Sequence, residues 1–342
     1  MTASARLACA LAAALACCAA ASPAAARDPA MTVPKAKLAA ALRCPSGLTH
    51  PARDPVLLVH GTGTNPEDTW GWNYVKALPG AGYDACTVRL PLDALGDIQP
   101  ASEYVVHAIR ALARRSGRRV SVIGHSQGTL EPRWAIRWWP RSVRPRVGDY
   151  ISMAGPHHGV AAGDGCVAGG SCWPAAWQMS SGSMFLRALN AGDETPGGIS
   201  YTSVFSDSDE LVQPSRPVAT AALRGGGANV ANVRVQDVCP GRPVHHGGQV
   251  HDALVWRLVL DALGHRGPAR VARVPVAVCV DDFMPGVDFQ RAYEGNQQLY
   301  SGAARAFSEG ERGSSEPPLR PYTRRQSRRS PGVRDERHRP SR

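Results

Sequence analysis

The fold is decided by the stretch Val120-Ser-Val-Ile-Gly-His-Ser-Gln-Gly128. Its first five residues form a short, mainly apolar run that predicts a buried strand. A helical pattern follows over residues 133–139 and stops at Pro140. A strand, a tight turn that carries Gly-x-Ser-x-Gly and a helix make up the pattern of a nucleophile elbow, which lifts a serine hydroxyl above a sheet.

The elbow accounts for the residues around Ser126. The turn is so tight that the residues two positions before and after the serine must lack bulk, and these are Gly124 and Gly128. The serine stands at the start of the next helix, whose dipole favours developing negative charge. An ordinary turn serine is the alternative, but the strand and helix patterns on either side favour a nucleophile. We therefore interpret Ser126 as the nucleophile.

Strand and helix patterns alternate through the rest of the chain. Further strands are predicted over residues 55–60, 84–90, 149–154, 199–205 and 230–238, and further helices over residues 102–115 and 249–263. This alternation predicts an α/β fold with a mostly parallel central sheet flanked by helices. Residues 156–181 interrupt it with five glycines and two tryptophans, and we expect a small lid there, over the edge of the sheet.

Charge is concentrated at the two ends of the 342-residue chain. The formal net charge is +11, of which residues 1–43 carry +4 and residues 305–342 carry +6. The intervening part is nearly neutral, and a surface that binds nucleic acid would need its basic residues there. The composition is 43% hydrophobic and 20% charged, which argues against a wholly disordered chain, a collagen-like fibre and a polytopic membrane protein.

The ends also suggest the domain organisation. Residues 1–26 resemble a secretory signal, with Arg6, an apolar run over residues 7–21 and small residues before a cleavage site. That run is short for a membrane anchor, which is one alternative, and a lipoprotein site at Cys17 is a poorer match. We expect an N-terminal extension over residues 27–43, one catalytic domain over residues 44–322 and a disordered, arginine-rich tail over residues 323–342.

Six cysteines remain after the predicted signal: Cys44, Cys86, Cys166, Cys172, Cys239 and Cys279. An even number in an exported protein suggests three disulfides and a location outside the cytoplasm, either extracellular or periplasmic. Six cysteines allow fifteen pairings, although Cys166 and Cys172 flank a flexible, closable loop. The chain contains no Cys-x-x-Cys or His-Glu-x-x-His, so we expect no metal site.

A nucleophilic serine needs a histidine base and an acid. In this architecture the acid follows the serine along the chain, and the histidine follows the acid. The acid should follow a strand, and Asp207, Asp209 and Glu210 all come at the end of the strand predicted over residues 199–205. The histidine should stand in a later loop. His246 is favoured there, with His251, in the first turn of the predicted helix, and His245 as the alternatives; His265 and His338 are placed less suitably.

An oxyanion hole requires two backbone N–H donors. One is expected from Gln127, directly after the serine, and the other from the glycine-rich loop His60-Gly61-Thr62-Gly63. A phosphate-binding loop is the alternative for the glycines, but no lysine follows at P-loop spacing and no Rossmann pattern is completed.

Several stretches match one known family in order along residues 44–324. They are Pro55-Val-Leu-Leu-Val-His-Gly-Thr-Gly-Thr64, Gly82-Tyr-Asp-Ala-Cys86, Glu103-Tyr104, Ser126-Gln127-Gly128, Trp177-Gln178, Asp209-Glu-Leu-Val-Gln-Pro214, Val235-Gln-Asp-Val-Cys239, His246-Gly-Gly248 and Glu316-Pro-Pro-Leu-Arg-Pro-Tyr322. Together they resemble the lipase B type of secreted α/β-hydrolase. Two departures are His125, where the family's best-known member has Trp, and the stretch Pro156-His-His-Gly159, which replaces acidic residues near the acyl pocket.

The resemblance implies a role for each matching residue. Ser126 matches the nucleophile, Asp209 the acid and His246 the base, while Thr62 and Gln127 match the two oxyanion donors. Thr62 matches a residue that donates both its backbone N–H and its hydroxyl. The resemblance also implies two disulfides, Cys44–Cys86 and Cys239–Cys279, which leaves Cys166 and Cys172 to pair with each other.

We therefore expect a secreted serine ester hydrolase, and within that class a triacylglycerol lipase that works through an acyl-enzyme. The expected partner is a lipid or other ester, met at a lipid–water interface, with no cofactor, no nucleic acid, no stable membrane insertion and a monomeric state. A carboxylesterase or a polyester depolymerase is the alternative within hydrolases. A non-catalytic, polyanion-binding secreted protein that uses its arginine-rich tail is the alternative from another class.

Overall fold

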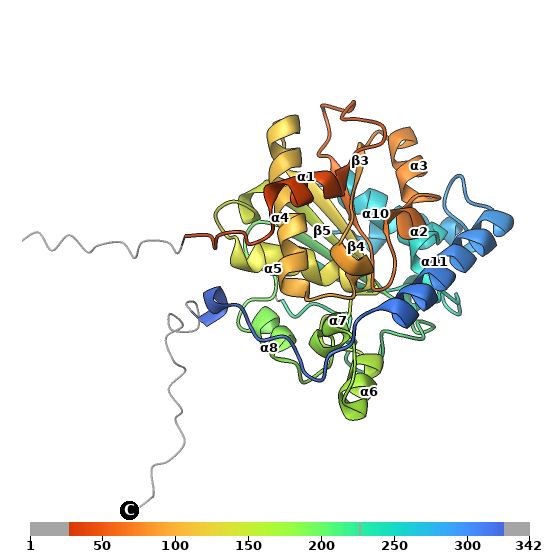
Figure 1. The fold of residues 1–342 in the computed structure, drawn as a ribbon. Coiled ribbons are helices and arrows are strands. Elements are labelled where there is room, and N and C mark those ends of the chain that lie inside the picture. Colours follow the sequence, from red (N-terminus) through yellow and green to blue (C-terminus); the bar gives the residue numbers. More distant parts are fainter. Residues whose placement is uncertain (1–26, 226, 325–342) are drawn as a thin grey trace, which may run out of the picture.

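A seven-stranded sheet forms the centre of the computed structural model, which describes residues 27–225 and 227–324 (Figure 1). The strand order is β1-β3-β2-β4-β5-β6-β7, and every neighbouring pair is parallel except β1 with β3. The strands are β1 (Leu42–Arg43), β2 (Val56–Val59), β3 (Ala85–Val88), β4 (Val120–His125), β5 (Val147–Met153), β6 (Ser200–Phe205) and β7 (Val230–Arg234). This is the mostly parallel sheet predicted from the alternation of patterns.

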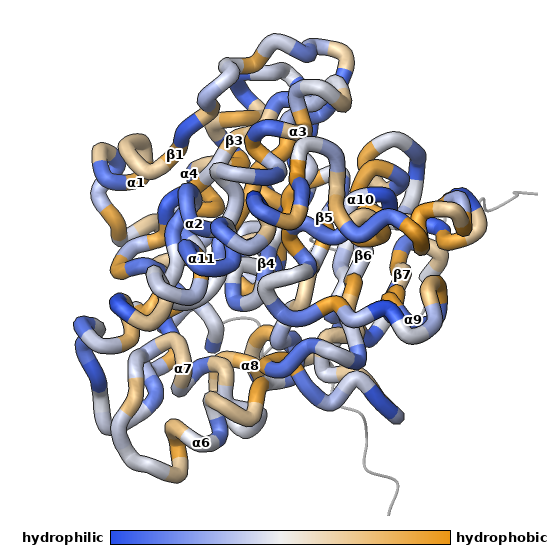
Figure 2. Tube along the Cα trace, turned by 90° about the vertical axis from the view of Figure 1, so that its right-hand side faces the viewer, coloured by the Kyte–Doolittle hydropathy of each residue, from blue (hydrophilic) through white to orange (hydrophobic). Residues whose placement is uncertain are grey.

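Helices cover both faces of the sheet, so its central strands are buried on both sides. Leu57 and Val59 of β2 point into a core that they share with α4 (Ile98–Ser116), α5 (Leu130–Trp138) and α8 (Met184–Asn190). Val56 and Leu58 point into the opposite core, formed with α2 (Pro66–Trp70), α3 (Tyr74–Gly80) and α10 (Ala253–Gly264). Figure 2 shows the hydrophobic segments gathered in the interior around the strands. Burial on both faces explains why these strands have continuous apolar sequences.

Two of the predicted elements end differently in the structure. The strand predicted over residues 230–238 ends at Arg234, and α9 (Val235–Val238) follows it as a single turn. The helix predicted over residues 249–263 begins only at Ala253, where the Asp252 side chain accepts a hydrogen bond from the Val255 N–H. His251 therefore precedes α10 and does not lie in its first turn. Aspartate is a strong N-cap residue, which is why the helix starts there.

The N-terminal extension belongs to the folded domain. Its helix α1 (Lys35–Ala41) buries Leu38, and its strand β1 pairs with β3. Ahead of the helix, the backbone N–H groups of Thr32 and Val33 donate to the carboxylate of Glu103 in α4, at 2.6 and 2.8 Å. These contacts across about 70 positions attach the segment firmly to the sheet and helix layer.

The longest helix, α11 (Phe289–Glu309), lies in a region for which the sequence analysis names no element. Its buried face consists mostly of small residues, among them Gly295, Gly302 and Ala303. A Cβ at Gly295 would lie 2.2 Å from the Trp72 ring, so the helix approaches that side chain closely. Figure 1 shows α11 (blue) beside α2. The spacing of these small residues is helical, so the pattern could have been found.

Residues 156–181 contain two short helices, α6 (Ala161–Gly169) and α7 (Pro174–Gln178). They lie next to α8 at one end of the molecule (Figure 1). Cys166 and Cys172 form a disulfide inside this segment, and Cys44–Cys86 and Cys239–Cys279 are also paired. All three expected pairs are thus present.

The predicted signal over residues 1–26 and most of the predicted tail lie outside the described residues. The short helix η7 (Pro321–Thr323) buries Thr323, so ordered structure continues slightly into the segment expected to be a tail. Within residues 27–225 and 227–324, none of the helices has the length and apolar character needed to cross a membrane.

Candidate active site

Ser126 directly follows β4, in a backbone conformation that L-residues rarely adopt. Its φ is +55°, and such left-handed positions store strain on the order of 1–3 kcal/mol. The neighbouring glycines are sterically required, since a Cβ at Gly124 would lie 2.3 Å from the Gly128 carbonyl oxygen. A Cβ at Gly128 would lie 2.4 Å from the carbonyl oxygen of His60. The turn is therefore a nucleophile elbow of the predicted kind.

His246 and Asp209 are paired within the protein. The His246 Nδ1 lies 3.0 Å from each carboxylate oxygen of Asp209, and both side chains are almost fully buried. Asp209 follows β6 and His246 follows α9, so two loops separated by 37 positions meet here. Because Nδ1 donates to the carboxylate, Nε2 is left as the acceptor that a histidine base requires.

Asp209 is held ionised by its surroundings. Burial by itself would raise the pKa of its carboxyl, but hydrogen bonds outweigh burial and hold that pKa below its ordinary value. The donors are His246, the backbone N–H groups of Leu211 and Val212, and the side-chain amide of Gln249. A carboxylate held in this way can both orient the His246 ring and stabilise its cation.

The other two candidate acids have different partners. Asp207 forms an ion pair with Arg234 at 2.7 Å. Glu210 receives the backbone N–H of His246 at 2.9 Å and the Tyr300 hydroxyl of α11 at 3.0 Å, and that hydroxyl accepts the Gly247 N–H at 3.1 Å. Glu210 and Tyr300 thus hold the backbone of the loop that carries His246.

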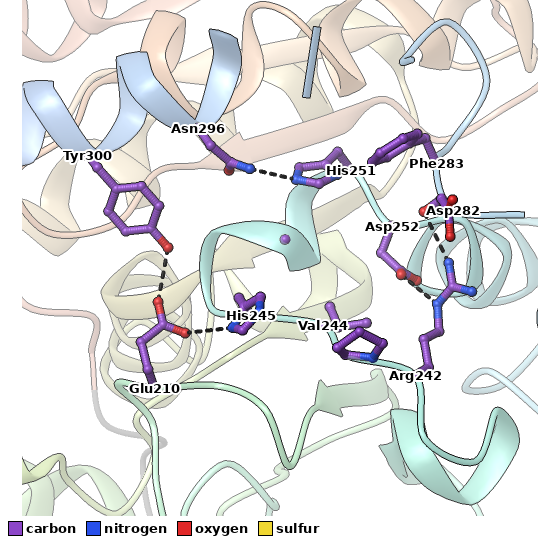
Figure 3. A pocket seen from close by; sticks show the side chains of 12 residues that line it. Glu210, Arg242, Val244, His245, His251, Asp252, Asp282, Phe283, Asn296 and Tyr300 are labelled. Carbon is purple, nitrogen blue, oxygen red and sulfur yellow. Dashed lines mark hydrogen bonds and ion pairs between the residues drawn. The ribbon is translucent and has the colours of Figure 1, made fainter. Parts of the chain in front are cut away.

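The two alternative histidines, His245 and His251, have other partners than Asp209. Figure 3 shows Glu210 reaching toward both Tyr300 and His245, and His251 facing Asn296 of α11. His245 is 69% exposed and lies 3.8 Å from Glu210, whereas His251 is buried and bonded to Asn296 at 3.2 Å. Neither residue contacts Asp209 in the structure. They line a second pocket of about 470 Å³, whose lining includes neither Asp209 nor His246.

The loop after β2 is fixed by a neutral histidine. Burial lowers the pKa of His60 to about 4. Its Nε2 accepts the Leu90 N–H at 2.9 Å, and its Nδ1 donates to the Gly61 carbonyl at 3.1 Å. The loop continues into Thr62, whose hydroxyl donates to the side-chain oxygen of Gln127 at 2.7 Å. The two residues expected at the oxyanion hole are therefore in direct contact.

An apolar cavity of about 300 Å³ connects these groups. Ser126, His246 and Thr62 all line it, as do Leu211 and Val212, and nonpolar side chains from two further segments form much of the walls. Those side chains are Val160, Ala162, Trp173, Ala176 and Met179 from residues 156–181, with Leu299, Ala303 and Phe307 from α11. The arrangement suits an ester that has an apolar chain.

His125 also lines the cavity, in the position where the family's best-known member has Trp. Burial, and then the neighbouring His246, lower the pKa of His125 to about 3, so its ring is neutral. Its Nε2 donates to the carbonyl oxygen of His246 at 3.0 Å. Of the stretch Pro156-His-His-Gly159, Pro156 lines the cavity, whereas His157 is buried against the Ser152 hydroxyl at 2.9 Å.

Sequence reasoning missed Glu131, Glu210 and Tyr300 as contributors to this site. Glu210 was considered only as the acid, and Tyr300 lies on the helix that was not predicted. Glu131 gives the clearest signal, because it is an acid in the first turn of the elbow helix, on a face that must be buried. Within residues 27–225 and 227–324, no three His, Cys, Asp or Glu side chains are grouped as a metal site requires.

Comparison with known proteins agrees with this geometry. The chain is 32% identical to lipase B of Pseudozyma antarctica over 308 residues, which is 87% of each chain. The chain belongs to the lipase B family. Lipase B of Aspergillus fumigatus has the same fold, with a TM-score of 0.79 and 29% identity over 86% of this chain and 73% of that one. The family described as "Putative serine esterase (DUF676)" matches residues 93–197. As a lipase B relative, this protein is a carboxylic ester hydrolase.

Proposed function

We propose that this lipase B relative is a secreted lipase that hydrolyses triacylglycerols through Ser126, His246 and Asp209. The observation that carries the proposal is the Asp209–His246 pair, whose His246 lines the same apolar cavity as the strained Ser126. The arrangement requires no cofactor, because a serine, a base and an oriented acid suffice for acyl transfer.

The reaction proceeds in two halves. His246 Nε2 takes the Ser126 proton while the serine oxygen attacks the ester carbonyl, and the backbone N–H groups of Thr62 and Gln127 stabilise the oxyanion. The tetrahedral intermediate collapses as His246 protonates the departing alcohol, which leaves an acyl-serine. Water then attacks this ester with His246 again as the base, and the acid is released when the Ser126 hydroxyl is restored.

The residue-level test is Ser126→Ala. The variant should fold with an unchanged circular dichroism spectrum and lose hydrolysis of both p-nitrophenyl esters and emulsified triacylglycerols. Turnover above a few per cent of the original value, after removal of contaminating esterases, would contradict the assignment of the nucleophile.

Substrate class is tested with a panel of p-nitrophenyl esters and acylglycerols from C2 to C16. A lipase should retain turnover on long, emulsified acylglycerols, since the walls contributed by residues 156–181 and α11 are apolar. Activity confined to short, soluble esters would instead indicate a carboxylesterase, and release of monomers from a polyester film a depolymerase.

We also infer that residues 156–181 act as a lid, because α6 and α7 contribute side chains to one wall of the cavity that contains Ser126. Export is inferred from the predicted signal and the three disulfides. The polyanion-binding alternative is tested by deleting residues 325–342. If esterase turnover is unchanged while retention on heparin falls, the tail has a separate role.

A further inference from the structure

A row of buried polar groups leads from the oxyanion loop into the protein. The Thr62 hydroxyl donates to the Gln127 side-chain oxygen at 2.7 Å, and the Gln127 side-chain nitrogen donates to Glu131 Oε1 at 2.8 Å. Glu131 belongs to the first turn of α5 and is fully buried. Its second oxygen, Oε2, has no partner among the described residues. The Gln127 side chain thus connects Glu131 to the hydroxyl of Thr62.

Glu131 is placed to carry a proton near neutrality. Burial raises the pKa of its carboxyl from 4.5 to about 8, although the hydrogen bond from Gln127 opposes the increase. On α5 itself, the cation nearest in sequence is Arg133, which approaches Glu194 at 3.8 Å. Tyr150 of β5 is close enough to Glu131 for the two groups to interact electrostatically, and its hydroxyl donates to the Thr129 carbonyl. No described cation pairs with Glu131, and burial outweighs the hydrogen bonds that favour the ionised form.

The protonation state of Glu131 determines which way the Gln127 side-chain amide must face. An ionised Glu131 can only accept, so Gln127 presents its NH₂ to the carboxylate and its oxygen to Thr62, as in the structure. The Thr62 hydroxyl hydrogen is then used by Gln127. A protonated Glu131 is a donor, and a buried O–H without an acceptor is unfavourable. If the amide turns by 180°, its oxygen accepts that O–H and its nitrogen donates to Thr62.

We propose that Glu131 is a positioning residue for the oxyanion hole: as a neutral acid it turns the Gln127 amide and thereby frees the Thr62 hydroxyl to donate to the reacting ester. Once freed, that hydroxyl has the Met179 sulfur at 4.0 Å as its other neighbour, which is a much weaker acceptor than an oxyanion. The proposal rests on the proposed function, because it assigns a further residue to the same reaction.

The kinetic test compares the original protein with Glu131→Gln between pH 6 and pH 10. Above about pH 8 the original protein should lose kcat by on the order of 10- to 100-fold, with KM little changed, because one donor to the oxyanion is withdrawn. Glu131→Gln should show no such decline, because its amide donates at every pH. An unchanged alkaline decline in Glu131→Gln would overturn the proposal.

Two further variants separate positioning from a general structural effect. Asp149→Asn changes a partly buried acid, which lies on β5 and is bonded to Ser121, and it should leave the alkaline decline as it was. Thr62→Val removes the hydroxyl and should abolish the decline, so that adding Glu131→Gln changes nothing further. A decline that persists in Thr62→Val and is still removed by Glu131→Gln would show that Glu131 acts by another route.

A measurement of stability tests the proton itself, independently of activity. Between about pH 4.5 and pH 8 the unfolded chain ionises Glu131 while the folded chain does not, so the original protein should lose stability across this window. The melting temperature of Glu131→Gln should therefore rise relative to the original protein from pH 5 to pH 8. A difference in melting temperature that stays constant from pH 5 to pH 8 would show that Glu131 is already ionised and would refute the proposal. Failure of the proposed function would be visible separately, as turnover that survives Ser126→Ala.

Discussion

Ser126 combines the proposed nucleophilic hydroxyl with a strained backbone, and the two properties can be separated by mutation. At φ +55° alanine keeps the strain and glycine relieves it. Ser126→Gly should therefore be more stable to denaturant than Ser126→Ala by about 1 kcal/mol, although both lack the hydroxyl and are equally inactive. An alanine variant as stable as the glycine variant would show that the elbow is unstrained.

Asp209 is the residue whose role is best tested against a neighbour. Asp209→Asn should lower kcat on the order of 10⁴-fold, because an amide can present its NH₂ to Nδ1 and select the wrong tautomer of His246. Asp207→Asn is the matched control, since that carboxylate is held by Arg234. Steady-state kinetics on a p-nitrophenyl ester measure both. Equal losses in the two variants would contradict the assignment.

At the scale of elements, α11 supports the loop that carries His246. The Tyr300 hydroxyl bridges the Gly247 N–H and the Glu210 carboxylate, and Glu210 in turn receives the His246 N–H. Tyr300→Phe keeps the ring in the cavity wall but leaves the Gly247 N–H without this partner. We expect kcat to fall about 10-fold with KM nearly unchanged, because the lost hydrogen bond orients the base and does not bind substrate.

The control for this prediction lies on the same helix. Tyr293 is 56% exposed, so Tyr293→Phe should leave both kcat and the melting temperature unchanged. If Tyr293→Phe lowers kcat as much as Tyr300→Phe, the effect belongs to α11 as a whole and the bridge is not the cause.

At the scale of the whole molecule, the disulfides differ in how much chain they enclose. Cys44 and Cys86 are 42 positions apart, whereas Cys166 and Cys172 are six apart. Loop-closure entropy predicts a loss of about 4 kcal/mol on removing the first bridge and about 2 kcal/mol on removing the second. Denaturant unfolding of the paired Cys→Ala variants measures both losses. A larger loss from the Cys166–Cys172 pair would show that the segment over residues 156–181 stabilises the whole domain.

Local patterns were enough to predict most of the sheet and the elbow. The strands came from continuous apolar runs, because a sheet covered on both faces leaves no polar alternation to read. The two glycines around Ser126 came from the steric limits of one turn. The same reasoning misplaced the end of β7 and the start of α10, and the start of α10 is decided by the Asp252 cap and not by hydropathy.

The sequence by itself determined the α/β class, the turn that carries the proposed nucleophile and a short set of candidate acids and histidines, because each depends on residues within a few positions of one another. Only the tertiary structure decided that Asp209 bonds to the His246 ring. Asp207 pairs with Arg234, and Glu210 binds the His246 backbone and Tyr300. The tertiary structure also revealed the buried Glu131 behind Gln127. The physical reason is that hydrogen bonding and burial depend on distances between loops tens of positions apart, which no local pattern specifies.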